Sequence, residues 1–154
     1  MSKLLILGLG GRGRMVGEVA RGLGRWDAVA FLDDAVHEED VVGKCMDYTA
    51  LAGQYEEAVA AFGDNRLRLA WTHRLEEAGY RVPSIVHPTA IVSPSVRMGA
   101  GCLVLHSAII NTNTTLGAAC LVNSGALVDH DNQLGDGVHV NLHATIRAWC
   151  SMPP

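Results

Sequence analysis

The chain has 154 residues, 49% of them hydrophobic, and a formal net charge of -4 at pH 7. This length is enough for one ordinary domain or two small ones, and the acidic balance argues against a general nucleic-acid-binding protein. No apolar run approaches the roughly 18–20 residues of a membrane span, and no signal peptide precedes the first apolar segment, so we expect a cytoplasmic protein without a membrane partner.

Residues 1–87 predict a small Rossmann-like α/β domain. Apolar runs at 3–7, 28–32 and 58–62 are typical of buried parallel strands. Helices are expected at about 14–23 and 65–78, where Gly24 and Gly79 would end them. Strands and helices that alternate in this way indicate a parallel sheet with helices packed on it.

A glycine-rich turn follows the first predicted strand. Gly8, Gly10 and Gly13 match the pattern G-x-G-x-x-G, and Asp33 follows at the spacing of the acidic residue in the dinucleotide-binding fingerprint. Backbone N–H groups at a helix N-terminus can bind phosphate, and a carboxylate after the second strand can bind a ribose hydroxyl. Because the domain lacks a second mononucleotide-binding half, we favour a nucleotide sugar over NAD. A purely structural glycine turn is the third interpretation.

Residues 88–154 predict a parallel β-helix. An aliphatic residue or Met returns at every sixth position from Val92 to Ile146, and a mostly small residue precedes each by two positions, from Ala90 to Ala144. A six-residue period is typical of coils that bury a shared core, with equivalent residues of successive coils stacked at about 4.8 Å. Cys102 and Cys120 are explained as small core residues, and no cysteine spacing indicates a metal site, so no metal is expected.

The end of the repeat suggests a short β-helix. Ten hexads make little more than three coils, and the tail 147–154 lacks the glycine and aliphatic residues that would continue the rhythm. We therefore expect that the repeat stops after Ile146, and a truncation or a shifted reading frame is a hypothesis. Comparison of the encoding DNA in all three frames would test it, and no continuing hexad pattern downstream would refute it.

The order of motifs along the chain resembles the sialic-acid O-acetyltransferase and UDP-aminosugar N-acetyltransferase family. The motifs are Gly8-Leu9-Gly10-Gly11, Phe31-Leu32-Asp33-Asp34, Phe62-Gly63-Asp64-Asn65 with Arg68, Val86-His87-Pro88-Thr89-Ala90, Val128-Asp129-His130-Asp131, Leu134-Gly135-Asp136 and Val138-His139-Val140. The resemblance implies a nucleotide-sugar-binding Rossmann-like domain and a left-handed β-helix that forms a homotrimer. It also implies that acetyl-CoA, the co-substrate, lies between neighbouring subunits.

The resemblance also implies roles for single residues. His130 would be the general base, Asp131 would orient its imidazole, and His139 would lie near the acetyl group or the substrate. The phosphate-binding turn would comprise Gly10, Gly11, Arg12 and Gly13. The nucleotide pocket would be lined by Asp33, Asp34, Gly63 and Asn65.

The residues around His130 suit this chemistry without the resemblance. Histidine exchanges a proton near neutral pH, and an adjacent carboxylate favours its protonated form. Asn111 and Thr112, one coil earlier, would lie beneath Asp129 and His130 and could line the same surface. On periodicity alone, His130 is a solvated corner residue; with the family motif, we favour the general base.

These observations lead to three hypotheses about function. The first is an acetyl-CoA-dependent acetyltransferase that acts on a nucleotide-linked amino sugar or a sialic-acid-type sugar, with nitrogen favoured over oxygen. The second is a non-catalytic nucleotide-sugar-binding or scaffolding protein that has lost its coenzyme A site. The third, an NAD-dependent enzyme, lacks an evident hydride-transfer site.

Overall fold

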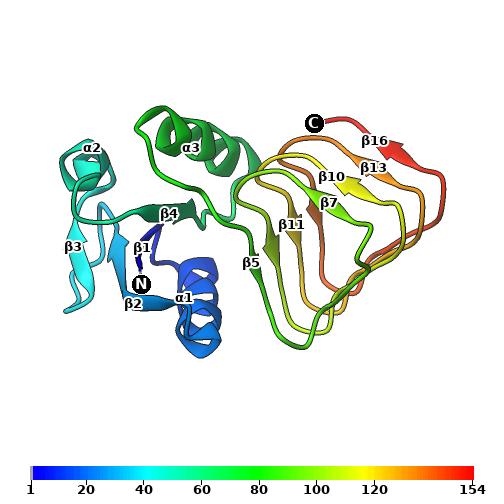
Figure 1. Ribbon diagram of the computed structural model, residues 1–154, viewed down its shortest axis with the longest axis horizontal. Helices are drawn as coiled ribbons and strands as arrows, with labels where there is room; N and C mark the ends of the chain where they lie inside the picture. The colour runs from blue at the N-terminus through cyan, green and yellow to red at the C-terminus, as the bar shows by residue number, and fades with distance from the viewer. Residues whose placement is uncertain (1) are drawn as a thin grey trace. The chain divides into compact units, whose positions relative to one another are not determined.

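The computed structural model describes residues 2–154 and divides into two compact units, Met1–Pro83 and Ser84–Pro154 (Figure 1). The boundary expected from the sequence lies after residue 87. The first β-helix strand begins earlier than that, because Ile85–Val86 already pairs with Leu103–Val104. No helix among residues 2–154 has the length and hydrophobicity needed to cross a membrane.

The first unit contains a four-stranded parallel sheet with the strand order β3-β2-β1-β4. Its strands are β1 (Ser2–Leu7), β2 (Trp26–Leu32), β3 (Val41–Gly43) and β4 (Glu57–Ala60). Its helices are α1 (Gly11–Leu23), the 3-10 helix η1 (Cys45–Asp47), α2 (Tyr48–Leu51) and α3 (Asn65–Glu77). The strands and long helices expected from the sequence are present, whereas β3, η1 and α2 are too short to give a periodic signal.

Side chains alternate between the two faces of this sheet along each strand, and each face packs against a different helix. Leu5 and Leu7 belong to a core cluster with Trp71 and Leu75 of α3. On the opposite face, α1 approaches so closely that a Cβ at Gly17 would lie 2.5 Å from the Phe31 ring. Figure 1 shows α1 and α3 on opposite sides of the sheet. This arrangement leaves the carboxyl ends of the strands open for the turns that follow them.

The second unit is a parallel β-helix with three sides. Each side is a sheet of four strands: the β5 side (β14-β11-β8-β5), the β6 side (β15-β12-β9-β6) and the β7 side (β16-β13-β10-β7). The strands are β5 (Ile85–Val86), β6 (Ile91–Val92), β7 (Arg97–Met98), β8 (Leu103–Val104), β9 (Ile109–Ile110), β10 (Thr115–Leu116), β11 (Leu121–Val122), β12 (Leu127–Val128), β13 (Gln133–Leu134), β14 (His139–Val140), β15 (Thr145–Ile146) and β16 (Ser151–Met152). Each strand pairs with the strand three hexads away, such as Leu121 with Leu103, which confirms the predicted stacking.

Both predicted columns line the interior of the β-helix. The core cluster contains large side chains such as Val104, Ile110 and Leu116 together with small ones such as Ala108 and Cys120. One column of small positions differs, because Thr114 and Asn132 are polar and fully buried.

The corners of the β-helix follow the same period. One residue in six has a positive φ, from Gly101 to Trp149, and Asp131 (φ 55°) is one of them. Glycine fills this left-handed position at 101, 125 and 137, and non-glycine residues fill it at the others. Asp and Asn tolerate this backbone better than most residues.

The expectation that the repeat stops after Ile146 is wrong. Ser151–Met152 forms β16 and pairs with Gln133–Leu134, so the coils continue for another hexad. Cys150 and Met152 occupy the small and large columns, one coil after Asn132 and Leu134. With β5 at the other end, the chain has four strands on each side rather than little more than three.

Candidate active site

The sequence Asp129-His130-Asp131 forms a corner between the β6 side and the β7 side. We call residues 129–132 the His130 corner; they follow β12 and precede β13. Nδ1 of His130 lies 2.6 Å from Oδ2 of Asp131, and the His130 side chain is 47% exposed. The structure therefore brings together the predicted base and its carboxylate partner. When Nδ1 is protonated and donates a hydrogen bond to Asp131, Nε2 has a free lone pair.

Asp129 stabilises this corner from inside the turn. Its Oδ1 accepts hydrogen bonds from the backbone N–H of His130 (2.8 Å) and from Nδ2 of Asn111 (3.1 Å). The hydrogen bond from the His130 amide, followed by the one from Asn111, lowers the pKa of Asp129. Asp129 is therefore ionised at neutral pH and ties the corner to the preceding coil.

The second predicted histidine, His139, lies on β14 of the β5 side. A corner of a three-sided coil is opposite the third side, so a single chain does not bring His139 together with His130. Nε2 of His139 lies 3.2 Å from Nδ2 of Asn123, and Asn123 is buried. The two histidines can contribute to one site only if neighbouring copies assemble it.

In the first unit, the glycine-rich turn joins β1 to α1. A Cβ at Gly13 would lie 1.9 Å from the carbonyl oxygen of Gly8, and Gly8 has a φ of 96°, so these two glycines are required by the backbone itself. Gly10 and Gly11 are exposed, and a Cβ on either would meet nothing within 4 Å. The turn therefore leaves open space at the N-terminus of α1, where N–H groups favour an anion.

Two arginines place positive charge in the first turn of α1. Arg12 is half-buried, and this burial lowers its pKa. Arg14 is exposed and pairs with Glu38, with Nη2 and Oε1 2.5 Å apart. The hydrogen bond with Glu38 raises the pKa of Arg14, so both groups stay charged at neutral pH. The helix N-terminus and Arg12 together form an electropositive region beside Gly10 and Gly11.

Asp33 and Asp34 follow β2, and each carboxylate accepts hydrogen bonds from backbone amides of the first unit. Oδ2 of Asp33 accepts from Leu9 N (2.8 Å), and its Oδ1 accepts from the amides of two residues that follow it. Burial, the largest single contribution, raises the pKa of Asp33, but these backbone hydrogen bonds outweigh it and the pKa is lowered. Oδ1 of Asp34 accepts from Cys45 N. Only the remaining lone pairs of these carboxylates are available to a ligand.

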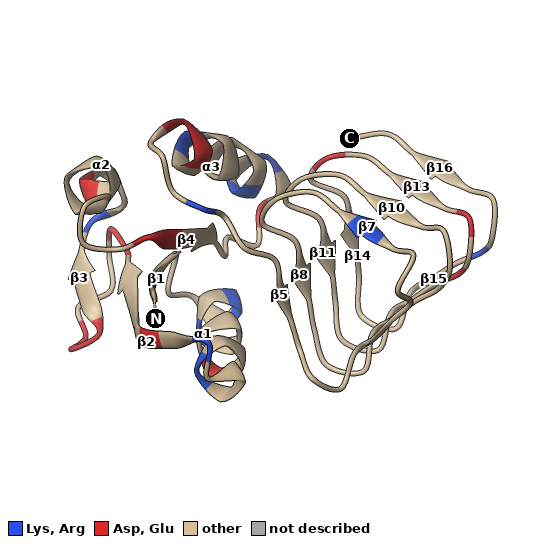
Figure 2. Ribbon diagram, viewed as in Figure 1, with Lys and Arg blue, Asp and Glu red and all other residues tan. Residues whose placement is uncertain are grey.

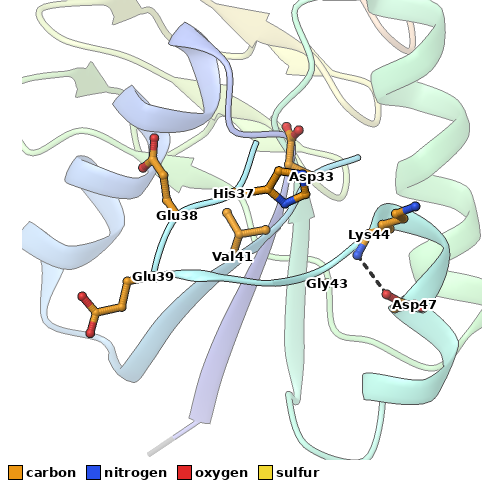
Figure 3. Close-up of a pocket in the computed structure, with 8 residues that line it drawn as sticks. All are labelled: Asp33, His37, Glu38, Glu39, Val41, Gly43, Lys44 and Asp47. Atoms are coloured by element: carbon orange, nitrogen blue, oxygen red, sulfur yellow. Dashed lines mark hydrogen bonds between the residues drawn. The ribbon is translucent and has the colours of Figure 1, made fainter. Parts of the chain in front are cut away.

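A hollow of about 570 Å³ lies beside Asp33 (Figure 3). The residues that line it are mostly ionisable: Asp33, His37, Glu38, Glu39, Val41, Gly43, Lys44 and Asp47. Neither Asp34 nor the predicted residues of the glycine-rich turn are among those that line it.

Gly63 and Asn65 follow β4 at the same edge of the sheet, and both are exposed. The buried side chain of Arg68 fixes their loop, because its Nη1 donates to the Phe62 carbonyl (3.1 Å) and its Nη2 to Oδ1 of Asn65 (3.0 Å). Phe62 also lies against the turn, since a Cβ at Gly8 would be 3.0 Å from its ring. The sheet therefore gathers the turns after β1, β2 and β4 at one edge.

Comparison with known proteins identifies relatives that contain both units. Residues 3–75 match the model of the PglD N-terminal domain. The structure of PerB from Caulobacter crescentus in complex with CoA and GDP-perosamine is 34% identical, with a TM-score of 0.83, and the match covers 90% of this chain and 68% of that one. The chain belongs to the nucleotide-aminosugar N-acetyltransferase family.

Further structures support this family membership. A histidine variant of GDP-perosamine N-acetyltransferase from Caulobacter crescentus, also in complex with CoA and GDP-perosamine, is 31% identical with a TM-score of 0.92, and the match covers 98% of this chain and 74% of that one. The acetyltransferase domain of PglB from Neisseria gonorrhoeae, in complex with acetyl-CoA, is 26% identical with a TM-score of 0.75, covering 99% and 93% of the two chains. The β-helix of this family member is thus of the left-handed hexapeptide-repeat type, as the resemblance implied.

Charge is distributed unevenly in this acetyltransferase-family chain. Figure 2 shows most Lys, Arg, Asp and Glu residues in the first unit and few in the β-helix. From residue 90 onward the charged residues are Arg97, Asp129, Asp131, Asp136 and Arg147. Two of these five belong to the His130 corner, which is therefore the main acidic point of the second unit. Among residues 2–154, no three His, Cys, Asp or Glu side chains are grouped to hold a metal ion.

The sequence analysis did not identify Asn123 or Trp149 as site residues of this family member. The Trp149 ring stands edge-on to His130, with centroids 6.2 Å apart, and Trp149 is 77% exposed. Hollows of about 430 and 270 Å³ flank it, one beside Asp129 and the other beside Asp131. Trp149 follows Asp131 by one full coil, so the coil period would have placed it at this corner.

Proposed function

We propose that this protein transfers the acetyl group of acetyl-CoA to the amino nitrogen of a nucleotide-linked aminosugar. The observation that carries the proposal is the 2.6 Å pair of His130 and Asp131 at an exposed corner of a chain of this family. The names of the relatives favour nitrogen over oxygen as the acceptor, and GDP-perosamine in two related structures favours a nucleotide-linked substrate.

In the proposed mechanism, His130 is the general base. Nδ1–H of His130 donates a hydrogen bond to Asp131 and keeps its proton, so Nε2 can accept the proton that the sugar nitrogen loses as this nitrogen attacks the thioester carbonyl carbon. A C–N bond forms, the C–S bond breaks, and the proton passes from Nε2 to the departing thiolate. The products are the N-acetylated sugar and free coenzyme A, and no covalent enzyme intermediate is needed.

The open edge of the first unit is the proposed place for the nucleotide. The diphosphate of the nucleotide sugar would accept hydrogen bonds from N–H groups of the first turn of α1, beside Gly10, Gly11 and Arg12. The remaining lone pair of Asp33 Oδ2 would accept a hydrogen bond from a ribose hydroxyl. Gly63 and Asn65 would border the same edge from the turn after β4.

We also propose that the active form is a homotrimer. His139 lies on the side opposite the His130 corner, so a site that uses both histidines needs neighbouring copies. The outward positions of the β6 side supply an apolar surface for such contact: Ile91 is 63% exposed, and Ile109 and Leu127 continue its column. A cytoplasmic location is part of this proposal, because the four free cysteines suit a reducing compartment.

The test combines coenzyme A release with calorimetric titration of UDP- and GDP-linked aminosugars. We expect His130→Ala to lower kcat by about 10²–10⁴-fold, with the affinity for the nucleotide sugar retained. His143→Asn is the matched control, because His143 occupies another corner and Asn tolerates its φ of 53°.

Three outcomes would contradict the proposal. Equal rates for wild type and His130→Ala would remove His130 from the mechanism. Sugar binding without coenzyme A binding or thiol release in wild type would favour a scaffold. An acetylated product that hydroxylamine cleaves would identify oxygen as the acceptor.

A further inference from the structure

Thr114 and Asn132 form a polar rung in the otherwise apolar inward columns of the β-helix. Both side chains are fully buried, and they occupy successive coils of the column of small residues next to the His130 corner. At the other two corners the same column holds residues such as Ala108 and Ala126, or Cys102 and Cys120. Buried polar groups are unfavourable unless they are hydrogen-bonded, so the contacts of this rung require an explanation.

Both side chains donate to the same acceptor, the carbonyl oxygen of Asp129. Oγ1 of Thr114 lies 2.9 Å from this oxygen, and Nδ2 of Asn132 lies 2.8 Å from it. The rung is also linked internally, because the backbone N–H of Asn132 donates to Oγ1 of Thr114 (3.3 Å). Oδ1 of Asn132 accepts from Cys150 N in the next coil (3.0 Å). Both lone pairs of the Asp129 carbonyl are thus used by side chains.

This carbonyl belongs to the peptide that joins Asp129 to His130. The N–H of the same peptide donates to Oδ1 of Asp129. The flanking amides of Asp129 and Asp131 donate to backbone carbonyls of adjacent coils, at 2.9 Å each. Within residues 2–154, no backbone group bonds to either end of the 129–130 peptide, so all of its hydrogen bonds come from side chains.

The two neighbouring corners use a backbone hydrogen bond at the equivalent carbonyl, whereas at the Gly99 corner the Ser84 hydroxyl bridges the Gly99 carbonyl and the Cys102 amide as Thr114 does here. The carbonyls of Asn123 and Gly135, one hexad before and after Asp129, accept the backbone N–H three positions later, at 3.1 and 3.4 Å. At the His130 corner that N–H is directed to Thr114 instead. At the His130 corner the polar rung therefore takes the place of the backbone hydrogen bond found at the two neighbouring corners, and Asn132 adds a second side-chain donor to the same carbonyl.

We propose that Thr114 and Asn132 are positioning residues, which orient the His130 imidazole by fixing the peptide that precedes it. The proposal rests on the proposed function for its catalytic consequence, whereas the orientation itself is a property of the free protein. Because proton transfer depends on hydrogen-bond geometry, a small rotation of this peptide displaces Nε2 from the attacking nitrogen and slows the chemical step more than binding.

The test uses two substitutions. Thr114→Val removes the hydroxyl and keeps the shape, and Asn132→Cys introduces the residue that stands at the equivalent small positions 102 and 120 of another corner. Thr114→Ser restores the hydroxyl. Cys120→Ala is the matched control, because Sγ of Cys120 contacts the carbonyl oxygen of Gly135 (3.2 Å) across the same sequence separation as Oγ1 of Thr114 and its acceptor.

In the acetyl-transfer assay, we expect Thr114→Val and Asn132→Cys to lower kcat about tenfold and to leave both KM values within about twofold. Thr114→Ser and Cys120→Ala should stay within about twofold of wild type in kcat. In the free protein, amide hydrogen exchange at His130, followed by NMR, should accelerate at least about tenfold in Thr114→Val and Asn132→Cys but not in Cys120→Ala.

The two readouts separate this proposal from the proposed function. A wild-type protein without acetyl transfer would overturn the proposed function, and the exchange measurement would still decide the role of the rung. Unchanged exchange at His130 in both rung variants would overturn the positioning proposal. So would a loss of kcat in Cys120→Ala equal to that in Thr114→Val, because the effect would then be one of general stability.

Discussion

The glycine-rich turn provides a sharp test, because its glycines are needed for different physical reasons. In Gly13→Ala, the new Cβ would lie 1.9 Å from the Gly8 oxygen and 2.7 Å from the Gly8 carbonyl carbon. Ordinary contact begins near 3.4 Å, so both distances are far too short and the backbone of Gly8 would have to move away from α1. Gly11→Ala is the control, since its Cβ would meet nothing within 4 Å and both positions lie in α1.

The expected loss follows from how the turn is attached. The Gly8 amide donates to the Leu32 carbonyl (2.8 Å), so displacing Gly8 disturbs the end of the sheet as well as the turn. Overpacking of this kind destabilises by about 1–3 kcal/mol. Replacing Gly by Ala in a helix returns at most about 1 kcal/mol, and this gain is largely shared by the control. We therefore expect Gly13→Ala to be about 1–3 kcal/mol less stable than Gly11→Ala.

Urea unfolding followed by circular dichroism measures this difference, and calorimetry with a nucleotide sugar supplies the second readout. The Gly11→Ala side chain should weaken nucleotide binding about tenfold or more, because its Cβ enters the space proposed for phosphate. Equal urea midpoints for the two variants would refute the steric argument. Unchanged affinity in Gly11→Ala would refute the assignment of the phosphate to this turn.

Two further predictions concern the same unit. Asp64→Ala should cost about 1 kcal/mol in unfolding free energy, because Oδ1 of Asp64 caps α3 by accepting from Leu67 N (2.8 Å), and an unchanged urea midpoint would contradict this. Because the pKa of Asp33 is lowered in the fold, its contribution to stability is complete at neutral pH and is lost as the pH falls through about 4 towards the folded value. The stability gap between wild type and Asp33→Asn should therefore be largest near pH 7 and shrink below pH 4, and a gap that is constant from pH 7 to 3 would exclude this ionic contribution.

The β-helix was predictable because its period is strict and its core columns contain few exceptions. The prediction failed only at the last hexad. Met152 and Cys150 match both columns in residue type and lie one full coil after Leu134 and Asn132, although the rest of the tail lacks the glycine of earlier hexads. The register of a stacked coil is set by the preceding coil, so a single poor hexad can still pair.

The candidate site was predictable to the extent that its members are neighbours in sequence. His130 and Asp131 are adjacent, so their pairing needed no long-range information. Trp149 and Asn123 contact His130 and His139 from other coils, and only the coil register could have placed them there. The hydrogen bond from the Leu9 amide to Asp33 depends on the conformation of the turn after β1, which the sequence pattern does not specify.

The same coil geometry explains why this corner can carry chemistry. Each corner from Gly101 to Trp149 has a left-handed residue, and Asp131 is the one at its corner, where its carboxylate also contacts the His130 ring. The sequence therefore uses a position that the fold constrains anyway to place the partner of the imidazole. The polar rung follows the same logic in the interior, because Thr114 and Asn132 fill a column that only needs small or medium side chains. The proposed chemistry uses positions where the repeat tolerates a polar residue, and the backbone geometry of the repeat holds those side chains in place.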